Sequence, residues 1–291
     1  SRLEADFSNK AFFPFPFDDI KQEASSLTGS AGLVYAKELN YKISASVATG
    51  YRVPNVDDLA KVFESTSSTL IIPNPSLKPE RTVNYELGAE KYFGKKVKLA
   101  VVAWYTDYTD ALTVSDATYK GQPTVNYNGG VATVKTTVNA AKAFNKGINA
   151  NFTAQVHSTI TVFSTITYTY GRIKEAAGKY PLDHIPPVYG KTSVAGNFKK
   201  IRAEIFALYN GEKSSKDFNL RGEDNQVYSA DPVNGLFPAW VTFNASCSYQ
   251  FNKNFRMQLS LENIADKFYR YFASGVSAPG RNLGVTARYS F

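Results

Sequence analysis

The residues that could carry out chemistry are few and scattered. The sequence contains two histidines, His157 and His184, and one cysteine, Cys247. A single cysteine excludes a disulfide framework and a zinc cluster built from cysteines. Neither histidine lies beside a nucleophile motif, so nothing in the pattern supports a Ser–His–Asp hydrolase. His184, in the segment PLDHIPP, could ligate a metal, but a structural role in that corner is favoured, and we predict no catalytic residue, no resident metal and no cofactor.

The charged residues point to no special partner. Asp107, Asp110 and Asp116 share one loop region, and Glu223 and Asp224 share another, but neither group has the spacing of a calcium-binding loop. The formal net charge is +8, and the basic residues are not gathered on one element. We therefore predict solvated loop carboxylates and no nucleic-acid partner.

The elements that must position these residues are β-strands. In WVTFNASCSYQF, residues 240–251, apolar and polar side chains alternate from Val241 to Phe251, with Cys247 among the apolar ones. Alternation with a period of two places one class of side chain on each face of a strand. Twelve such segments are predicted, at residues 1–6, 30–37, 41–49, 82–93, 97–114, 134–156, 159–171, 189–197, 200–210, 240–251, 254–262 and 281–291.

The connections between these segments alternate in length. Tight turns are predicted at 38–40, 94–96, 157–158, 198–199 and 252–253, and long loops at 7–29, 50–81, 115–133, 172–188, 211–239 and 263–280. In an up-and-down meander, this order places all the short turns at one rim and all the long loops at the other, which is typical of bacterial outer-membrane barrels. A soluble β-sandwich does not sort its loops in this way. The sequence therefore predicts an all-β, antiparallel up-and-down transmembrane β-barrel of about twelve strands, in contact with outer-membrane lipid.

The last segment, RNLGVTARYSF, carries apolar residues at every second position and ends on an aromatic ring. These residues are Leu283, Val285, Ala287, Tyr289 and Phe291. The pattern resembles the β-signal of outer-membrane proteins, and the resemblance implies the barrel-assembly machinery as a partner. Physically, such a strand must be paired, because an open sheet edge is costly in lipid.

Three motifs in the order YRVPN, NPSLKPE and NYELG, between residues 51 and 88, resemble the barrel of TonB-dependent outer-membrane receptors. PLDHIPP, ENIADKFYR and APGRNLGVTARYSF follow in the order of that family, and GEDNQVY and FPAW are similar to the form common in Bacteroidetes. The motif residues with expected structural roles are Tyr51, Arg52, Pro54, Asn74, Pro75, Leu77 and Glu80.

The resemblance implies both an architecture and a function. Barrels of this family have 22 strands around an N-terminal plug, so residues 1–291 are expected to form the C-terminal half of such a barrel, without the plug domain. The implied function is a receptor in the outer membrane of a Gram-negative bacterium, not an enzyme. It would bind a scarce, bulky nutrient for import energised by TonB–ExbB–ExbD through the plug. A passive porin is the main alternative, and it would lack the YRVP and NPSLKPE boxes; an outer-membrane hydrolase is a more distant one.

The small-molecule ligand is left open between a ferric siderophore, which is favoured, and heme or cobalamin. Paired boxes similar to YRVP and NPSL occur in heme receptors with a histidine between them, and residues 55–72 contain no histidine. Ferric chelates are often anionic and planar, which suits Arg, Lys and Tyr side chains in loops. The candidate ligand contacts are Tyr108, Tyr119, Arg172, Lys174, Lys213, Lys216 and Arg221. For any single one of them, an interfacial aromatic or a solvated charge is the preferred interpretation.

Overall fold

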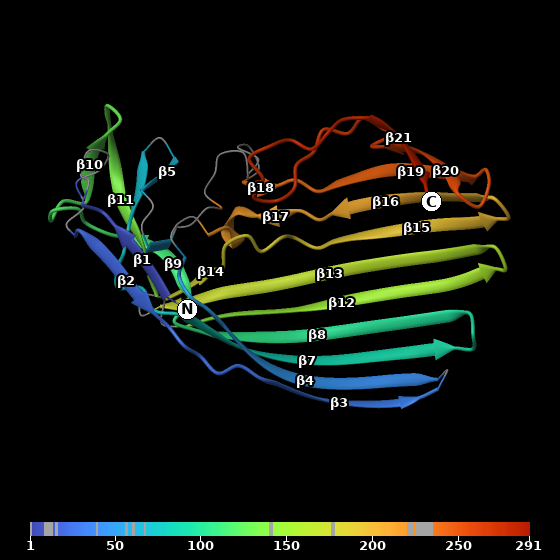
Figure 1. Cartoon of the computed structure of the whole chain (residues 1–291), viewed down its shortest axis with the longest axis horizontal. Coiled ribbons are helices and arrows are strands. Elements are labelled where there is room, and N and C mark those ends of the chain that lie inside the picture. Colours follow the sequence, from blue (N-terminus) through green and yellow to red (C-terminus); the bar gives the residue numbers. More distant parts are fainter. Residues whose placement is uncertain are drawn as a thin grey trace.

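The wall of the molecule is one antiparallel sheet of twelve strands, shown edge to edge in Figure 1. The computed structural model describes residues 2–8, 14, 17–38, 40–55, 58–59, 62–66, 68–139, 142–175, 178–219, 224 and 235–291. No helix in these ranges is both long enough and apolar enough to span a bilayer.

Eleven strands follow one another across the sheet in chain order, each antiparallel to the next. They are β3 (Ser30–Lys37), β4 (Tyr41–Arg52), β7 (Glu80–Phe93), β8 (Val97–Thr109), β12 (Lys142–His157), β13 (Ile160–Glu175), β15 (Tyr189–Phe198), β16 (Ile201–Asn210), β19 (Trp240–Gln250), β20 (Phe255–Glu262) and β21 (Asn282–Tyr289). The twelfth, β14 (Gly178–Pro181), pairs with the end of β13. The predicted up-and-down topology is confirmed, with β3 and β21 at the two edges of the sheet. That these strands are half of a 22-stranded barrel stays a prediction.

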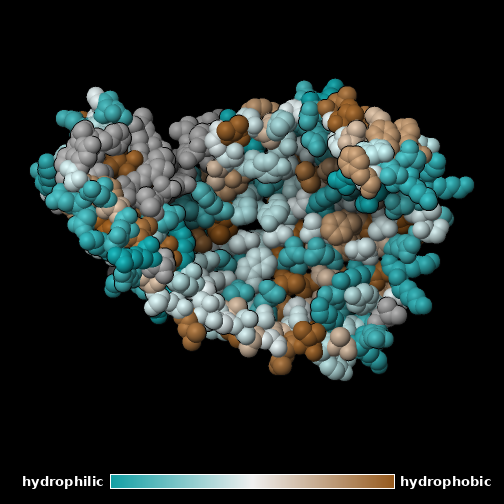
Figure 2. Space-filling view, viewed as in Figure 1, coloured by the Kyte–Doolittle hydropathy of each residue, from teal (hydrophilic) through white to brown (hydrophobic). Residues whose placement is uncertain are grey.

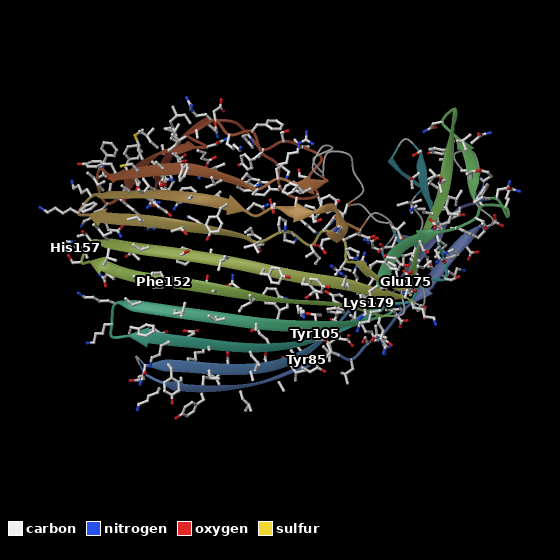
Figure 3. The ribbon with its side chains drawn as sticks, turned by 180° about the vertical axis from the view of Figure 1, so that it is seen from behind. Tyr85, Tyr105, Phe152, His157, Glu175 and Lys179 are labelled. Carbon is white, nitrogen blue, oxygen red and sulfur yellow. The ribbon has the colours of Figure 1, made fainter. Side chains whose placement is uncertain are left out.

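The two ends of the wall differ as the loop lengths predict. The tight turns gather at one end and the long connections at the other (Figure 1). His157 closes β12 at the tight-turn end, where its Nδ1 lies 2.9 Å from Thr159 Oγ1 (Figure 3). By the topology of outer-membrane barrels, the tight turns mark the periplasmic rim and the long connections mark the outer rim.

The long connections contain strands that the alternation did not reveal. A five-stranded sheet stands at the outer end, formed by β5 (Phe63–Thr66), β6 (Thr69–Ile72), β9 (Leu112–Asp116), β10 (Thr124–Tyr127) and β11 (Gly130–Asn139). Its core is built from Leu70, Tyr119, Ala132 and Val134. Two pairs of short strands complete this end: β1 (Arg2–Asp6) with β2 (Asp19–Glu23), and β17 (Lys213–Ser214) with β18 (Leu236–Phe237).

Three sequence predictions are wrong at this end. Residues 1–6 do not belong to the wall, because β1 pairs only with β2. Residues 97–114 are not one strand, because Asp110 takes a left-handed φ of 57° and turns the chain out of the wall. Residues 134–156 likewise divide into β11 and β12. The bend is stabilised by Asn139, whose Nδ2 donates to the carbonyl oxygens of Asp110 and Lys78, both at 2.8 Å.

The polarity of the wall is inverted relative to a soluble protein. Large apolar side chains on alternate positions are exposed, including Leu87 at 65%, Phe243 at 55% and Val285 at 61%. On the opposite face of β19, Thr242 and Asn244 are buried. Hydrophobic side chains protrude along the lower margin of the view in Figure 2, over β3 and β4. An apolar outer face and a polar inner face are what a strand in a lipid bilayer requires.

Candidate ligand-binding site

Three side chains form a floor on the inner face of the wall near the outer rim. Tyr189 is paired in register with Asn210, and Asn210 is paired with Trp240, on three adjacent strands. Val241, the neighbour of Trp240, belongs to the outward apolar set and is 42% exposed, so Trp240 faces inward. The antiparallel register of β15, β16 and β19 therefore places two aromatic rings and an amide side by side at the end of the strands.

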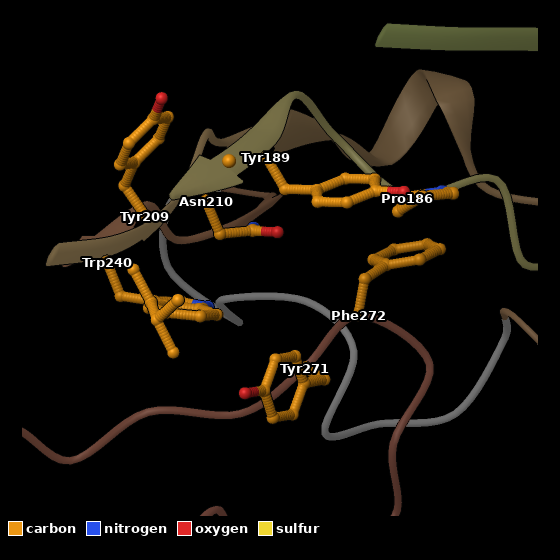
Figure 4. A pocket seen from close by; sticks show the side chains of 9 residues that line it. Pro186, Tyr189, Tyr209, Asn210, Trp240, Tyr271 and Phe272 are labelled. Carbon is orange, nitrogen blue, oxygen red and sulfur yellow. The ribbon is translucent and has the colours of Figure 1, made fainter. Parts of the chain in front are cut away.

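The long connection after β20 covers this floor with more rings. Tyr271 lies edge-on to Trp240 with ring centroids 5.4 Å apart, and Tyr269 lies 4.4 Å from the same indole. Phe272 packs against Phe237 at 5.3 Å. The rings of Tyr189, Trp240, Tyr271 and Phe272 and the Asn210 amide surround a cavity of about 290 Å³, which is also lined by Pro186 and Leu208 (Figure 4). We call this cavity the aromatic pocket.

The aromatic pocket contains one unused hydrogen-bond donor. Trp240 is only 7% exposed, and its indole Nε1–H has no hydrogen-bond partner among the residues that the structure describes. By contrast, Trp104, which also faces inward, donates to Asn145 Oδ1 at 3.2 Å. A buried donor without a partner costs about 1–3 kcal/mol. The pocket therefore has flat apolar walls, and the unsatisfied N–H belongs to one of the rings that line it.

A cation lies behind the aromatic wall. The Nζ of Lys213 is 4.0 Å from the Phe272 ring centroid and donates to the carbonyl oxygen of Ile185. Burial lowers the pKa of Lys213, and the nearby carboxylates of Asp224 and Asp217 oppose that shift. Lys213 also lines a second cavity of about 170 Å³ together with Arg172, which forms an ion pair with Asp217. Charged side chains are therefore gathered beside the aromatic pocket.

The predicted ligand contacts do not form one group. Arg172 and Lys213 share the second cavity, and Lys216 follows in a 3-10 turn, Ser215–Asp217. Lys174 lies on the outer face of β13, with its Nζ 4.9 Å from the Phe144 ring. Tyr119 is buried in the outer sheet, where its hydroxyl donates to Pro14 O.

Tyr108 faces inward but stands apart from the aromatic pocket. Its hydroxyl accepts a hydrogen bond from Asn145 Nδ2 at 2.7 Å, in the network that includes Trp104. Arg221 lies outside the described residues. The role of each candidate as a ligand contact stays a prediction.

Sequence reasoning missed the rings of the aromatic pocket. The signal for Trp240 is present, because it is an aromatic residue on the otherwise polar face of β19. Tyr189 could be found only through the register of three strands. Tyr271 and Phe272 lie in an irregular connection, and no periodicity marks them.

The motif residues anchor the outer sheet to the wall. Arg52 forms an ion pair with Asp58 at 2.6 Å, and Asp58 and Asn55 exchange backbone-to-side-chain hydrogen bonds. Glu80 accepts from the backbone N–H of Leu112 at 2.9 Å. Asn74 donates to Thr137 O at 2.8 Å.

Two of the motif residues, Pro54 and Leu77, are also buried. Pro54 is fully buried, and Leu77 packs with Ile20 and Leu59. Tyr51 is 36% exposed in β4, and Pro75 precedes β7 in the same connection. The structural role of the motif residues stays a prediction, with which these contacts are consistent.

His184 lies in the connection before β15, and the predicted assembly signal lies on and just after β21. The backbone N–H of His184, which has φ 57°, donates to Asp224 Oδ1 at 3.1 Å. No group of three or more His, Cys, Asp or Glu side chains within the described ranges could hold a metal ion. On the terminal strand, Leu283, Val285, Tyr289 and Phe291 are exposed, and Ala287 lies between them on the same face. Their role as an assembly signal stays a prediction.

The inverted polarity, the sorted connections and the inner pocket define a wall of an outer-membrane β-barrel. The chain belongs to the family of TonB-dependent receptor-like β-barrels, whose model matches residues 3–264. This confirms the resemblance found in the sequence and places the chain in the outer membrane of a Gram-negative bacterium.

Two curated relatives and two solved structures illustrate the similarity. The probable TonB-dependent siderophore receptor PirA of Acinetobacter baumannii is 23% identical over 94% of this chain and 40% of its own length. The hemoglobin and hemoglobin-haptoglobin-binding protein of Haemophilus ducreyi is 36% identical over 86% of this chain and 30% of its own length. The chain thus spans less than half the length of these relatives.

The solved structures share the fold at low sequence identity. The siderophore receptor PirA from Acinetobacter baumannii superposes with a TM-score of 0.65 at 18% identity, over 94% of this chain and 42% of that one. The copper transporter OprC superposes with a TM-score of 0.69 at 16% identity, over 94% of this chain and 40% of that one.

Proposed function

We propose that this chain forms part of the ligand-binding wall of an outer-membrane receptor for a ferric siderophore that carries aromatic groups. Import would be energised by TonB–ExbB–ExbD acting through a plug domain. The observation that carries the proposal is the aromatic pocket, with its unpartnered indole donor on the inner face at the outer rim. An aromatic chelating group would fit between the rings, and its oxygen would accept the hydrogen bond from Trp240.

The size of the pocket supports a siderophore arm over a whole macrocycle. Pockets that enclose a drug-sized ligand measure about 300–1,000 Å³, and the aromatic pocket, at about 290 Å³, lies at the lower end of that range. It therefore suits one ring of a larger ligand, whose remainder would contact other loops. The similarity to the probable siderophore receptor PirA supports this interpretation.

Heme is the second candidate, because a relative with 36% identity is a hemoglobin-binding protein. Against it, the segment between the YRVP and NPSL boxes carries no histidine. A passive porin is the third candidate. Against it, a porin needs no aromatic pocket at its outer rim.

The test is a ligand panel on the full receptor that contains this chain, purified in detergent and titrated by calorimetry. The probes are a ferric tricatecholate, a ferric trihydroxamate without aromatic rings, and hemin. We expect tight binding of the tricatecholate only, and Trp240→Leu should weaken it by at least tenfold. Phe243→Leu removes a ring from the lipid-facing side of the same strand and should leave affinity unchanged. Binding of hemin alone, or ion conductance with no ligand bound, would overturn the siderophore proposal.

A further inference from the structure

A row of lysines crosses the outer face of the wall near the outer rim. Lys142 of β12 is paired in register with Lys174 of β13, which is paired with Lys179 of β14. In the other direction the row continues through Thr109 to Arg81. Like charges placed directly opposite each other in a sheet are destabilising. Within the described residues, none of the three lysines has an ion pair that would offset this repulsion.

The side chains of this row point toward the lipid side of the wall. Lys142 shares its face of β12 with Ile148 and Phe152, which are exposed at 45% and 38%. Lys174 shares its face of β13 with Tyr168, also exposed at 46%. In Figure 3, Lys179 lies nearer the outer end than Tyr85 and Tyr105, and Phe152 lies toward the opposite end.

Aromatic rings separate the lysine row from the apolar band. On the same face, the second row from the lysines toward the tight turns is again defined by cross-strand pairing. It contains Tyr85, Tyr105, Lys146 and Tyr170. Three cations stand over these rings and the neighbouring Phe144: Lys146 at 5.6 Å and Arg172 at 4.2 Å from Tyr170, and Lys174 at 4.9 Å from Phe144. Aromatic residues at such positions mark the boundary between hydrocarbon and headgroups.

The distance along the strand sets the depth of the lysines. Lys142 is four residues beyond Lys146, and a strand rises about 3.3 Å per residue. The lysine row therefore lies roughly 10 Å above the aromatic boundary after allowance for strand tilt, at the level of lipid headgroups. The face also carries Asp107, beside Phe144 in register, while Arg172 is already paired with Asp217. On this face the unpaired basic side chains outnumber the carboxylates. A bound anion would neutralise their excess positive charge.

We propose that Arg81, Lys142, Lys174 and Lys179, which we call the basic belt, bind the phosphate groups of a phosphorylated lipid in the outer leaflet of the membrane. The occupant is a lipid because the basic belt is continuous with the lipid-facing band and faces away from the lumen. Basic side chains near an anionic membrane surface each contribute about fivefold to binding. This site is independent of the imported ligand, whose pocket lies on the inner face.

The test compares two charge-matched triple variants of the full receptor. One carries Lys142→Gln, Lys174→Gln and Lys179→Gln; the control carries Lys95→Gln, Lys96→Gln and Lys253→Gln, three exposed lysines of the tight turns. Each is titrated with diphosphoryl lipid A and with its dephosphorylated form, and bound lipid is counted by native mass spectrometry. We expect the belt triple to lose at least tenfold in affinity for the diphosphoryl form, while the control changes by less than twofold.

A third variant guards against misfolding. Lys142→Arg, Lys174→Arg and Lys179→Arg keeps the charge and should bind as the wild type does. The glutamine triple should unfold no more readily than the wild type in lipid-free detergent, because it removes like-charge repulsion. Equal losses in the belt and control triples, or equal binding of the dephosphorylated lipid by the wild type, would overturn the proposal.

Discussion

Replacement of Trp240 by Phe separates ligand binding from folding. The indole Nε1–H is buried without a partner among the described residues, and such a donor costs the folded state about 1–3 kcal/mol. Trp240→Phe removes that cost, while the smaller ring gives up roughly 1 kcal/mol of apolar burial. We therefore expect the ligand-free free energy of unfolding to lie between unchanged and about 2 kcal/mol higher.

Binding should respond in the opposite direction. A hydrogen bond to a charged acceptor contributes about 1.5–3 kcal/mol, so Trp240→Phe should weaken binding of a ferric tricatecholate by roughly 10- to 100-fold. The assays are guanidinium unfolding of the full receptor in detergent and calorimetric titration of the ligand. Trp104→Phe is the matched control, because its N–H is already hydrogen-bonded to Asn145, and it should lower stability and leave binding intact. If Trp240→Phe lowers stability by more than about 2 kcal/mol and binding stays normal, the indole serves packing and our reasoning is wrong.

Three further predictions test the wall and the outer connections. Leu259 is on the lipid face at 53% exposure, so Leu259→Arg should lower the free energy of unfolding by about 2–4 kcal/mol if the residue lies near the bilayer midplane. Ser260→Arg, on the opposite face, should lower it little. Refolding into lipid vesicles measures both variants, and equal losses would contradict the assignment of faces. Gly147→Ala should lower stability by about 1–3 kcal/mol, because an added Cβ would meet the Trp104 ring and the opposing strand backbone. A neutral result in thermal unfolding would contradict the close packing of both around this glycine. Burial raises the pKa of Tyr269 to about 12, so the folded state holds this proton more tightly than the unfolded state. The contribution of this group to stability is complete below about pH 10 and is lost as the pH rises toward 12. The ultraviolet titration difference between the wild type and Tyr269→Phe should show a phenol that ionises near pH 12, and ionisation near pH 10 would contradict the burial.

The wall could be predicted because its signals are local. Alternation fixes which residues face lipid, and the length of each connection fixes the rim at which it lies. The outer sheet could not be predicted in this way, because its parallel pairing of β6 with β11 joins segments about sixty residues apart. Neither segment contains a local pattern that would predict its pairing with the other.

The two candidate sites depend on register, which the sequence reveals only in part. A bulge between Gln155 and His157 shifts the pairing of β12 and β13, and this shift places Lys142 opposite Lys174. Without it, the two lysines would not stand in one row. In the aromatic pocket, Trp240 could be noticed as an aromatic residue on a polar face, but Tyr271 and Phe272 approach it only through the folding of an irregular connection.

The central claim is that the wall presents one face to lipid and the other to an aqueous lumen. It is tested most directly by placing single spin labels at five successive positions of β12, from Ile148 to Phe152, in the full receptor reconstituted in bilayers. We predict that labels at 148, 150 and 152 are relaxed mainly by oxygen, which partitions into lipid, and labels at 149 and 151 mainly by a water-soluble nickel chelate. Equal accessibility at all five positions, or alternation of the opposite phase, would contradict it.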